Sequence, residues 1–106
     1  MPPLTAQNAA NREGALSDLA AEMMSEQASN LGRMGRDVER ALADLAAAAP
    51  EHRPARLDAA ADAVWRYFIQ REVAGVRNHA PAIADYRIPG AVLSRLGARP
   101  RKSGTG

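Results

Sequence analysis

The sequence predicts an all-α protein, built as an antiparallel helical hairpin with one long helix and short C-terminal helices. Alanine fills 24 of the 106 positions and aromatic residues make up only 4%, a composition that favours helix and is poor in strand-forming residues. Apolar residues also recur at steps of three or four, the helical period, and no segment shows sustained alternation with period two. Both observations favour helix over sheet.

The chain has the length of one ordinary domain and no cysteine, which removes disulfides, thiolate nucleophiles and Cys-ligated metal sites. The N-terminus shows no basic start followed by an apolar stretch, and no window approaches the roughly 18 to 20 apolar residues of a membrane span. We therefore expect a soluble, cytoplasmic protein without membrane contact.

The expected order of segments begins with residues 1–13, which contain two prolines and no apolar periodicity and are predicted to be disordered. A single helical domain is expected over residues 14–98. Residues 99–106 are predicted to be a disordered basic tail.

A long first helix is predicted from a stripe of ten positions spaced by three or four. Its mean step of about 3.67 residues describes a helix that runs nearly straight. At 1.5 Å per residue the stripe would be roughly 50 Å long, too long for so short a chain to cover alone. The ten positions are Leu16, Leu19, Met23, Gln27, Leu31, Met34, Val38, Leu42, Leu45 and Ala49.

Two glycines, Gly32 and Gly35, interrupt this stripe. Each costs a helix about 1 kcal/mol relative to alanine, so the helix can kink or break there. Alternatively, Ala28, Gly32 and Gly35 allow another helix to approach closely. The sequence leaves both interpretations open.

The hairpin turn is predicted at residues 49–54, because Pro50 cannot continue a helix and Pro54 suits a first helical turn. The second helix is expected over about residues 54–78, with Trp65 beside its apolar stripe. Asn78 and Pro81 would end it. Two short helices, at about 81–86 and 89–96, are then expected to meet at Arg87 and Ile88 and to end at Gly97.

The short helices match a helix-turn-helix in part, over residues 81–97. The turn position usually filled by glycine is Arg87, and PGAVLSRL offers only Ser94 and Arg95 to reach bases or phosphates. A basic cluster comes next, and the halves 1–50 and 51–106 carry net charges of −3 and +5. These halves can pack on each other, or the basic half can meet nucleic acid. The residues of this alternative are Arg95, Arg99, Arg101 and Lys102.

No arrangement predicts catalysis, a metal site or a cofactor. Glu72 and His79 stand two helical turns apart and His52 falls in a loop, so spacing argues for neither a metal motif nor an acid–base pair. The serines lack a nucleophile motif and no glycine loop suits phosphate. We expect that the protein is not an enzyme.

The segment from Trp65 to Gly97 resembles a family of short bacterial proteins of unknown function. The shared features are a run of aromatic and arginine residues, followed by Asp85-Tyr86, Ile88-Pro89 and Leu96-Gly97. The resemblance transfers no catalytic or binding residue. It implies that the C-terminal half defines the family and that the long first helix varies more.

The predicted function is that of a protein-interaction or scaffolding module that self-associates, most simply as a two-fold dimer whose four long helices share a coiled-coil-like core. The apolar stripe could instead bind an unidentified protein partner. The alternative is a small nucleic-acid-binding protein that uses residues 81–97 and the basic tail. The interface is predicted at Leu31, Met34, Val38, Leu42, Leu45, Trp65, Phe68 and Ile69.

Overall fold

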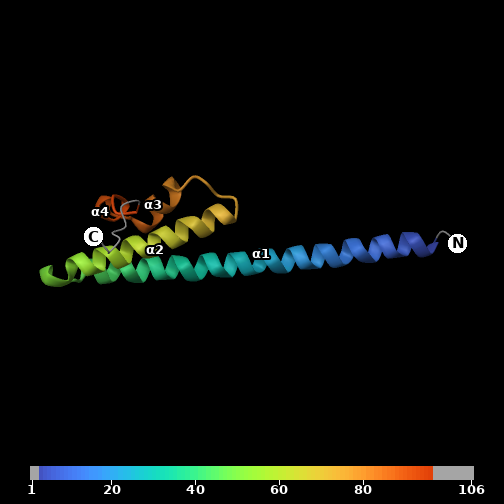
Figure 1. Cartoon of the computed structure of the whole chain (residues 1–106), viewed down its shortest axis with the longest axis horizontal. Helices are drawn as coiled ribbons and strands as arrows, with labels where there is room; N and C mark the ends of the chain where they lie inside the picture. Colours follow the sequence, from blue (N-terminus) through green and yellow to red (C-terminus); the bar gives the residue numbers. More distant parts are fainter. Residues whose placement is uncertain (1–2, 97–106) are drawn as a thin grey trace, which may run out of the picture. The chain divides into compact units, whose positions relative to one another are not determined.

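A computed structural model describes the backbone of residues 3–96 and the side chains of residues 11–96 (Figure 1). In this range the chain forms helices and no strand, which confirms the all-α prediction. The elements are α1 (Pro3–Ala46), the short 3-10 helix η1 (Pro50–His52), α2 (Arg53–Val73), α3 (Ala80–Tyr86) and α4 (Gly90–Leu93). The chain divides into two parts after Asn30.

Helix α1 is continuous through Gly32 and Gly35, so neither glycine breaks it. It also includes residues 3–13, for which the sequence predicts disorder, and it ends three residues before the expected Ala49. None of the described helices combines the length and the apolar character needed to cross a membrane.

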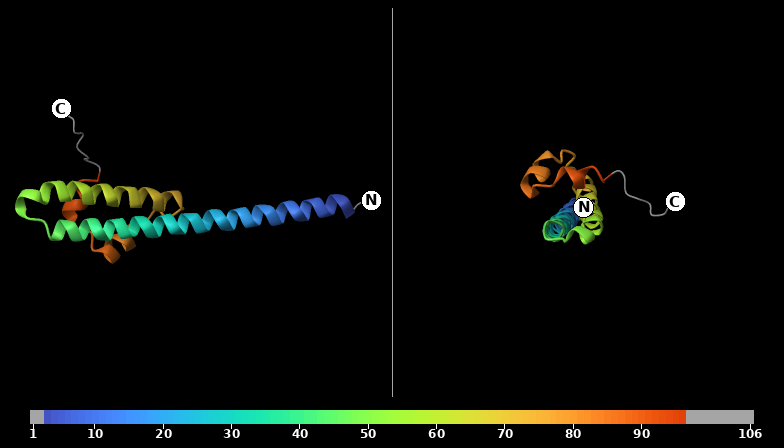
Figure 2. Two further views of the ribbon diagram at one scale, coloured as in Figure 1. Left: turned by 90° about the horizontal axis from the view of Figure 1, so that it is seen from below. Right: turned by 90° about the vertical axis from the view of Figure 1, so that its left-hand side faces the viewer.

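The hairpin turn lies where the two prolines predict it. After α1 ends, the Ala48 N–H donates a hydrogen bond to the Leu45 carbonyl, and Ala49 takes an extended conformation that leads into Pro50. Helix η1 then runs directly into α2, which returns alongside the C-terminal portion of α1 (Figures 1 and 2).

Helix α2 ends at Val73, five residues before the predicted end at residue 78. Gly75 adopts the left-handed conformation, with φ of 94°, and the Val76 N–H bonds the Arg71 carbonyl at 2.9 Å. This arrangement is the Schellman motif that commonly closes helices at a glycine. The stop signal is therefore Gly75 rather than Asn78 or Pro81.

Helices α3 and α4 meet at a second left-handed residue, Arg87, whose φ is 53°. The Ile88 N–H bonds the Ile83 carbonyl at 3.0 Å, so arginine fills a position that usually favours glycine. The buried Ile88 comes immediately after it and anchors the turn in the core. The two predicted short helices are thus present, but α4 is a single turn.

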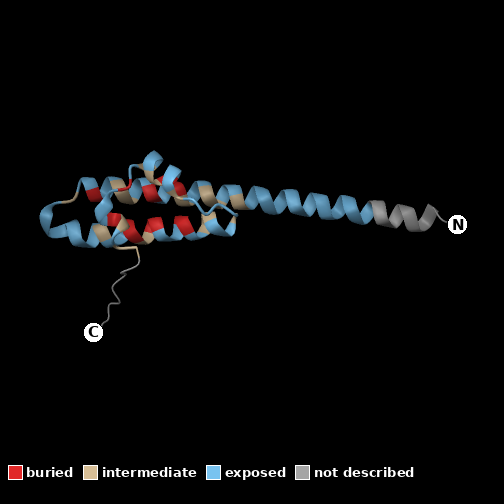
Figure 3. Cartoon of the chain, turned by 90° about the horizontal axis from the view of Figure 1, so that it is seen from above, coloured by how far each residue is buried: buried red, intermediate tan, exposed pale blue. Residues whose placement is uncertain are grey.

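The core lies in residues 31–96, where α2, α3 and α4 cover one face of the C-terminal portion of α1 (Figure 3). Its largest fully buried side chains are valines, one each from α1, α2 and α4. Partly buried residues, including Leu31, Met34 and Leu42, pack against it. The buried members are Val38, Leu45, Ala60, Ala61, Ala63, Val64, Tyr67, Phe68, Ala82, Ile88 and Val92.

Candidate functional site

The residues predicted to form an interface fall into three sets. Val38, Leu45 and Phe68 are buried in the chain's own core. Leu31, Met34 and Leu42 are partly buried against the same core. Trp65 and Ile69 alone among the eight remain substantially exposed, at 42% and 41%. At these six positions the apolar periodicity therefore marks the inner face of the hairpin. A contact between these residues and a second copy stays a prediction.

Gly35 permits the close approach that the sequence suggested, although the neighbour is a side chain rather than a helix backbone. A β-carbon at residue 35 would overlap the Tyr86 hydroxyl and lie 3.3 Å from Cζ of that ring. The Tyr86 ring meets the Tyr67 ring edge to face, with centroids 5.5 Å apart. Burial first, and then a hydrogen bond with Tyr67, raise the pKa of Tyr86 to about 12. This contact ties α3 to both long helices.

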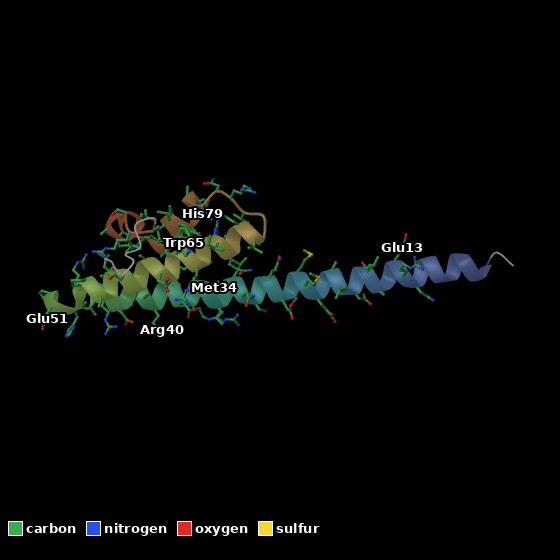
Figure 4. All side chains as sticks on the ribbon, in the orientation of Figure 1. Glu13, Met34, Arg40, Glu51, Trp65 and His79 are labelled. Atoms are coloured by element: carbon green, nitrogen blue, oxygen red, sulfur yellow. The ribbon has the colours of Figure 1, made fainter. Side chains whose placement is uncertain are left out.

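Exposed apolar side chains gather on α1 between residues 11 and 30. No residue from 11 to 29 is buried (Figure 3), and the side chains of this segment project from one helix (Figure 4). Leu16 is 59% exposed and Met23 is 56% exposed, with Leu19 and Met24 similar. We call Leu16, Leu19, Met23 and Met24 the α1 stripe. It offers contact area and no reactive group.

A second apolar surface runs along α2. Trp65, Ile69 and Val73 are spaced by four residues, which places them on one side of the helix. Ion pairs flank this row, one between Arg66 and Asp62 and one between Arg95 of the C-terminal segment and Asp58. This α2 row lies on a helix that already has a buried face.

The turn from α2 to α3 gathers a polar cluster that sequence spacing did not predict. Because the chain reverses at Gly75, His79 returns to α2, where its Nδ1 accepts from Nε of Arg71 at 3.2 Å and its Nε2 donates to Glu72 at 2.8 Å. The His79 ring also stacks on Phe68, with centroids 4.1 Å apart. Both ring nitrogens of His79 therefore make hydrogen bonds that hold the turn.

Metal ligation finds no support among the described side chains. Within residues 11–96, no three histidines, aspartates or glutamates gather closely enough to hold a metal ion. The Glu72 and His79 pair is completed by an arginine, which repels a cation.

The residues of the nucleic-acid alternative are only partly within the described structure. Arg95 pairs with Asp58, and the Ser94 hydroxyl donates to the Gly90 carbonyl, so both side chains are engaged within the chain. Arg99, Arg101 and Lys102 lie outside the described residues. Helix α4 has four residues and buries Val92, which leaves little helix to enter a groove.

Comparison with known proteins identifies the family. Residues 6–104 match a family of unknown function, DUF6665. The chain belongs to this family. The match to DUF6665 reaches far beyond residues 65–97, on which the sequence resemblance rested, and takes in α1 as well as the C-terminal helices. No curated protein and no solved structure matches the chain.

Proposed function

We propose that this protein is a self-associating helical interaction module, in which the α1 stripe of one copy binds the α1 stripe of a second copy. The observation that carries the proposal is the exposure of Leu16, Leu19, Met23 and Met24 on a helical segment with no buried residue from 11 to 29. In proteins, most of the stability of a helix comes from packing of its apolar face against a partner rather than from helix propensity. A second helix supplies that partner.

Burial energies favour such a contact over the charge that opposes it. Full burial of one leucine or methionine side chain contributes about 1.5 to 3 kcal/mol, whereas an exposed charge pair contributes at most about 1 kcal/mol. Residues 11–30 carry one arginine and four acidic residues. Asp18 and Glu22, spaced by four, lie beside the stripe rather than within it, and Glu26 lies at its edge. Two copies can therefore join their stripes while the Asp18 and Glu22 carboxylates stay in water.

The test measures molar mass by light scattering for the full chain and two variants. We expect a mass about twice the 11.3 kDa of one chain. Leu19→Asp should return the mass to that of a monomer, because it places an unpaired charge in the contact at a cost of several kcal/mol. Ser25→Asp adds the same charge on the far side of the same helix and should leave the dimer intact. A monomeric unmodified chain at micromolar concentration would contradict the proposal.

The same samples separate this proposal from nucleic-acid binding. Replacing Arg99, Arg101 and Lys102 by serine should leave the mass unchanged, because the α1 stripe is untouched. Tight, salt-sensitive binding of duplex DNA that this variant loses, with the mass unchanged, would instead support the helix-turn-helix alternative.

A further inference from the structure

The α1 stripe has one edge with opposite charges at its two ends. Arg12, Leu19 and Glu26 are spaced by seven residues, or about two helical turns, so they succeed one another along the same side of the helix. Glu13 lies about 100° further round the helix and belongs to a different edge. The edge therefore begins with a cation, carries an apolar residue at its centre and ends with an anion.

Helix direction decides which charges meet when two copies pair. In a parallel pair each residue is level with its own counterpart, so Arg12 of one copy and Glu26 of the other lie about 20 Å apart along the axis. In an antiparallel pair with its two-fold axis between Leu19 and Ala20, Leu16 is level with Met23 of the second copy. Measured along the helix axis, Arg12 is then only one residue, or about 1.5 Å, from Glu26 of the second copy. Opposite charges meet twice by symmetry.

We infer that residues 11–30 of two copies pair antiparallel about Leu19, with Arg12 of each copy against Glu26 of the other; this inference rests on the self-association proposed above. The pairing joins apolar side chains at the centre and oppositely charged ones at both ends. A second copy is the partner that fits, because the charges on this edge complement those on the same edge of another copy only when the two helices run in opposite directions. Asp18 and Glu22 lie outside this edge, where solvent and salt screen their repulsion.

Engineered cysteines test the direction, since the chain has none of its own. In the antiparallel pair, two Leu16→Cys chains hold their cysteines about 10 Å apart along the axis, beyond the roughly 7 Å between α-carbons that a disulfide spans. Leu16→Cys alone should therefore stay uncrosslinked under mild oxidation. An equimolar mixture of Leu16→Cys and Met23→Cys chains should form a covalent dimer.

Charge reversal tests the end contacts independently. Arg12→Glu and Glu26→Arg should each raise the dissociation constant of the dimer several-fold, and the double variant should restore it. Glu22→Arg changes the net charge as Glu26→Arg does but lies off the edge, so it should not weaken the dimer. In a parallel pair Arg12 has no Glu26 of the second copy within reach, so reversing its charge should leave the affinity nearly unchanged.

The outcomes are distinguishable by mass. A dimer in which Leu16→Cys alone crosslinks, or in which the double reversal restores nothing, would overturn the antiparallel register and leave self-association standing. A monomeric mass for the unmodified chain would overturn both.

Discussion

Residues 11–30 and residues 31–96 carry apolar side chains at the same helical spacing, but among the described residues the buried core lies in the second region. Val38 is fully enclosed, whereas Leu16 of the same helix α1 is 59% exposed. In the second region, the turn at Pro50 brings α2 back over residues 31–46. In the first region, no residue from 11 to 29 is buried.

Apolar periodicity thus identifies which face of a helix is buried, but it does not identify the element that buries it. The same pattern serves intramolecular packing at Val38 and, in our proposal, intermolecular packing at Leu19. Substitutions that affect one region and spare the other therefore test the division directly.

The largest expected effect is in the core of residues 31–96. Phe68→Ala removes a buried ring that packs against Tyr67 and His79 and should lower the free energy of unfolding by about 3 kcal/mol or more. Trp65→Ala on the same helix removes a side chain that is nearly half exposed and should cost roughly 1 kcal/mol. Urea denaturation followed by circular dichroism measures both. An equal loss at Trp65 would show that the α2 row is buried in the assembly.

A smaller effect is expected at the two glycines of α1. Gly35→Ala forces a methyl group against the Tyr86 hydroxyl and should destabilise residues 31–96 by about 1 to 3 kcal/mol. Gly32→Ala meets only the end of the Arg36 side chain, at 3.5 Å, and should stabilise the helix by up to about 1 kcal/mol. Adding Tyr86→Phe to Gly35→Ala should recover part of the loss. Equal shifts in melting temperature for both alanine variants would rule out the close contact.

The smallest expected effect is a dependence on alkaline pH. Because folding raises the pKa of Tyr86 from 10.0 to about 12, the folded state holds this proton more tightly than the unfolded state. The associated stability is complete below pH 10 and is lost as the pH rises from 10 towards 12. Thermal melts of the unmodified chain should fall more steeply over that range than melts of Tyr86→Phe. If the melting temperatures of the unmodified chain and of Tyr86→Phe fall equally with pH, Tyr86 is not the source of the pH dependence.

Much of the fold was predictable from local sequence, and the coverage of its faces was not. Helical spacing and Pro50 predicted the two long helices and the turn, because these signals act between near neighbours. The end of α2 was placed too late, since Asn78 and Pro81 are common stop signals and Gly75 sets the stop through its left-handed backbone. Arg87 takes a similar conformation without glycine, held by the burial of Ile88.

The candidate site shows the same limit. The apolar stripe from Leu16 onward was visible in the sequence. The predicted interface, however, included Val38, Leu45 and Phe68, which are buried in the core of the chain itself. Which half of a stripe stays exposed depends on where α2 begins and ends. Likewise, His79 reaches Arg71 and Glu72 only because the chain reverses at Gly75, a tertiary arrangement that spacing along one helix does not contain.

Amide hydrogen exchange measured at two protein concentrations tests the division between the regions most directly. Above the dissociation constant of the dimer, amides of residues 11–30 should be protected together with those of residues 31–96. Dilution well below that constant should remove protection from residues 11–30 and leave it unchanged in the hairpin core around Val38 and Val64. Protection of residues 11–30 that is independent of concentration, or absent at every concentration, would contradict the proposal that a second copy covers the α1 stripe.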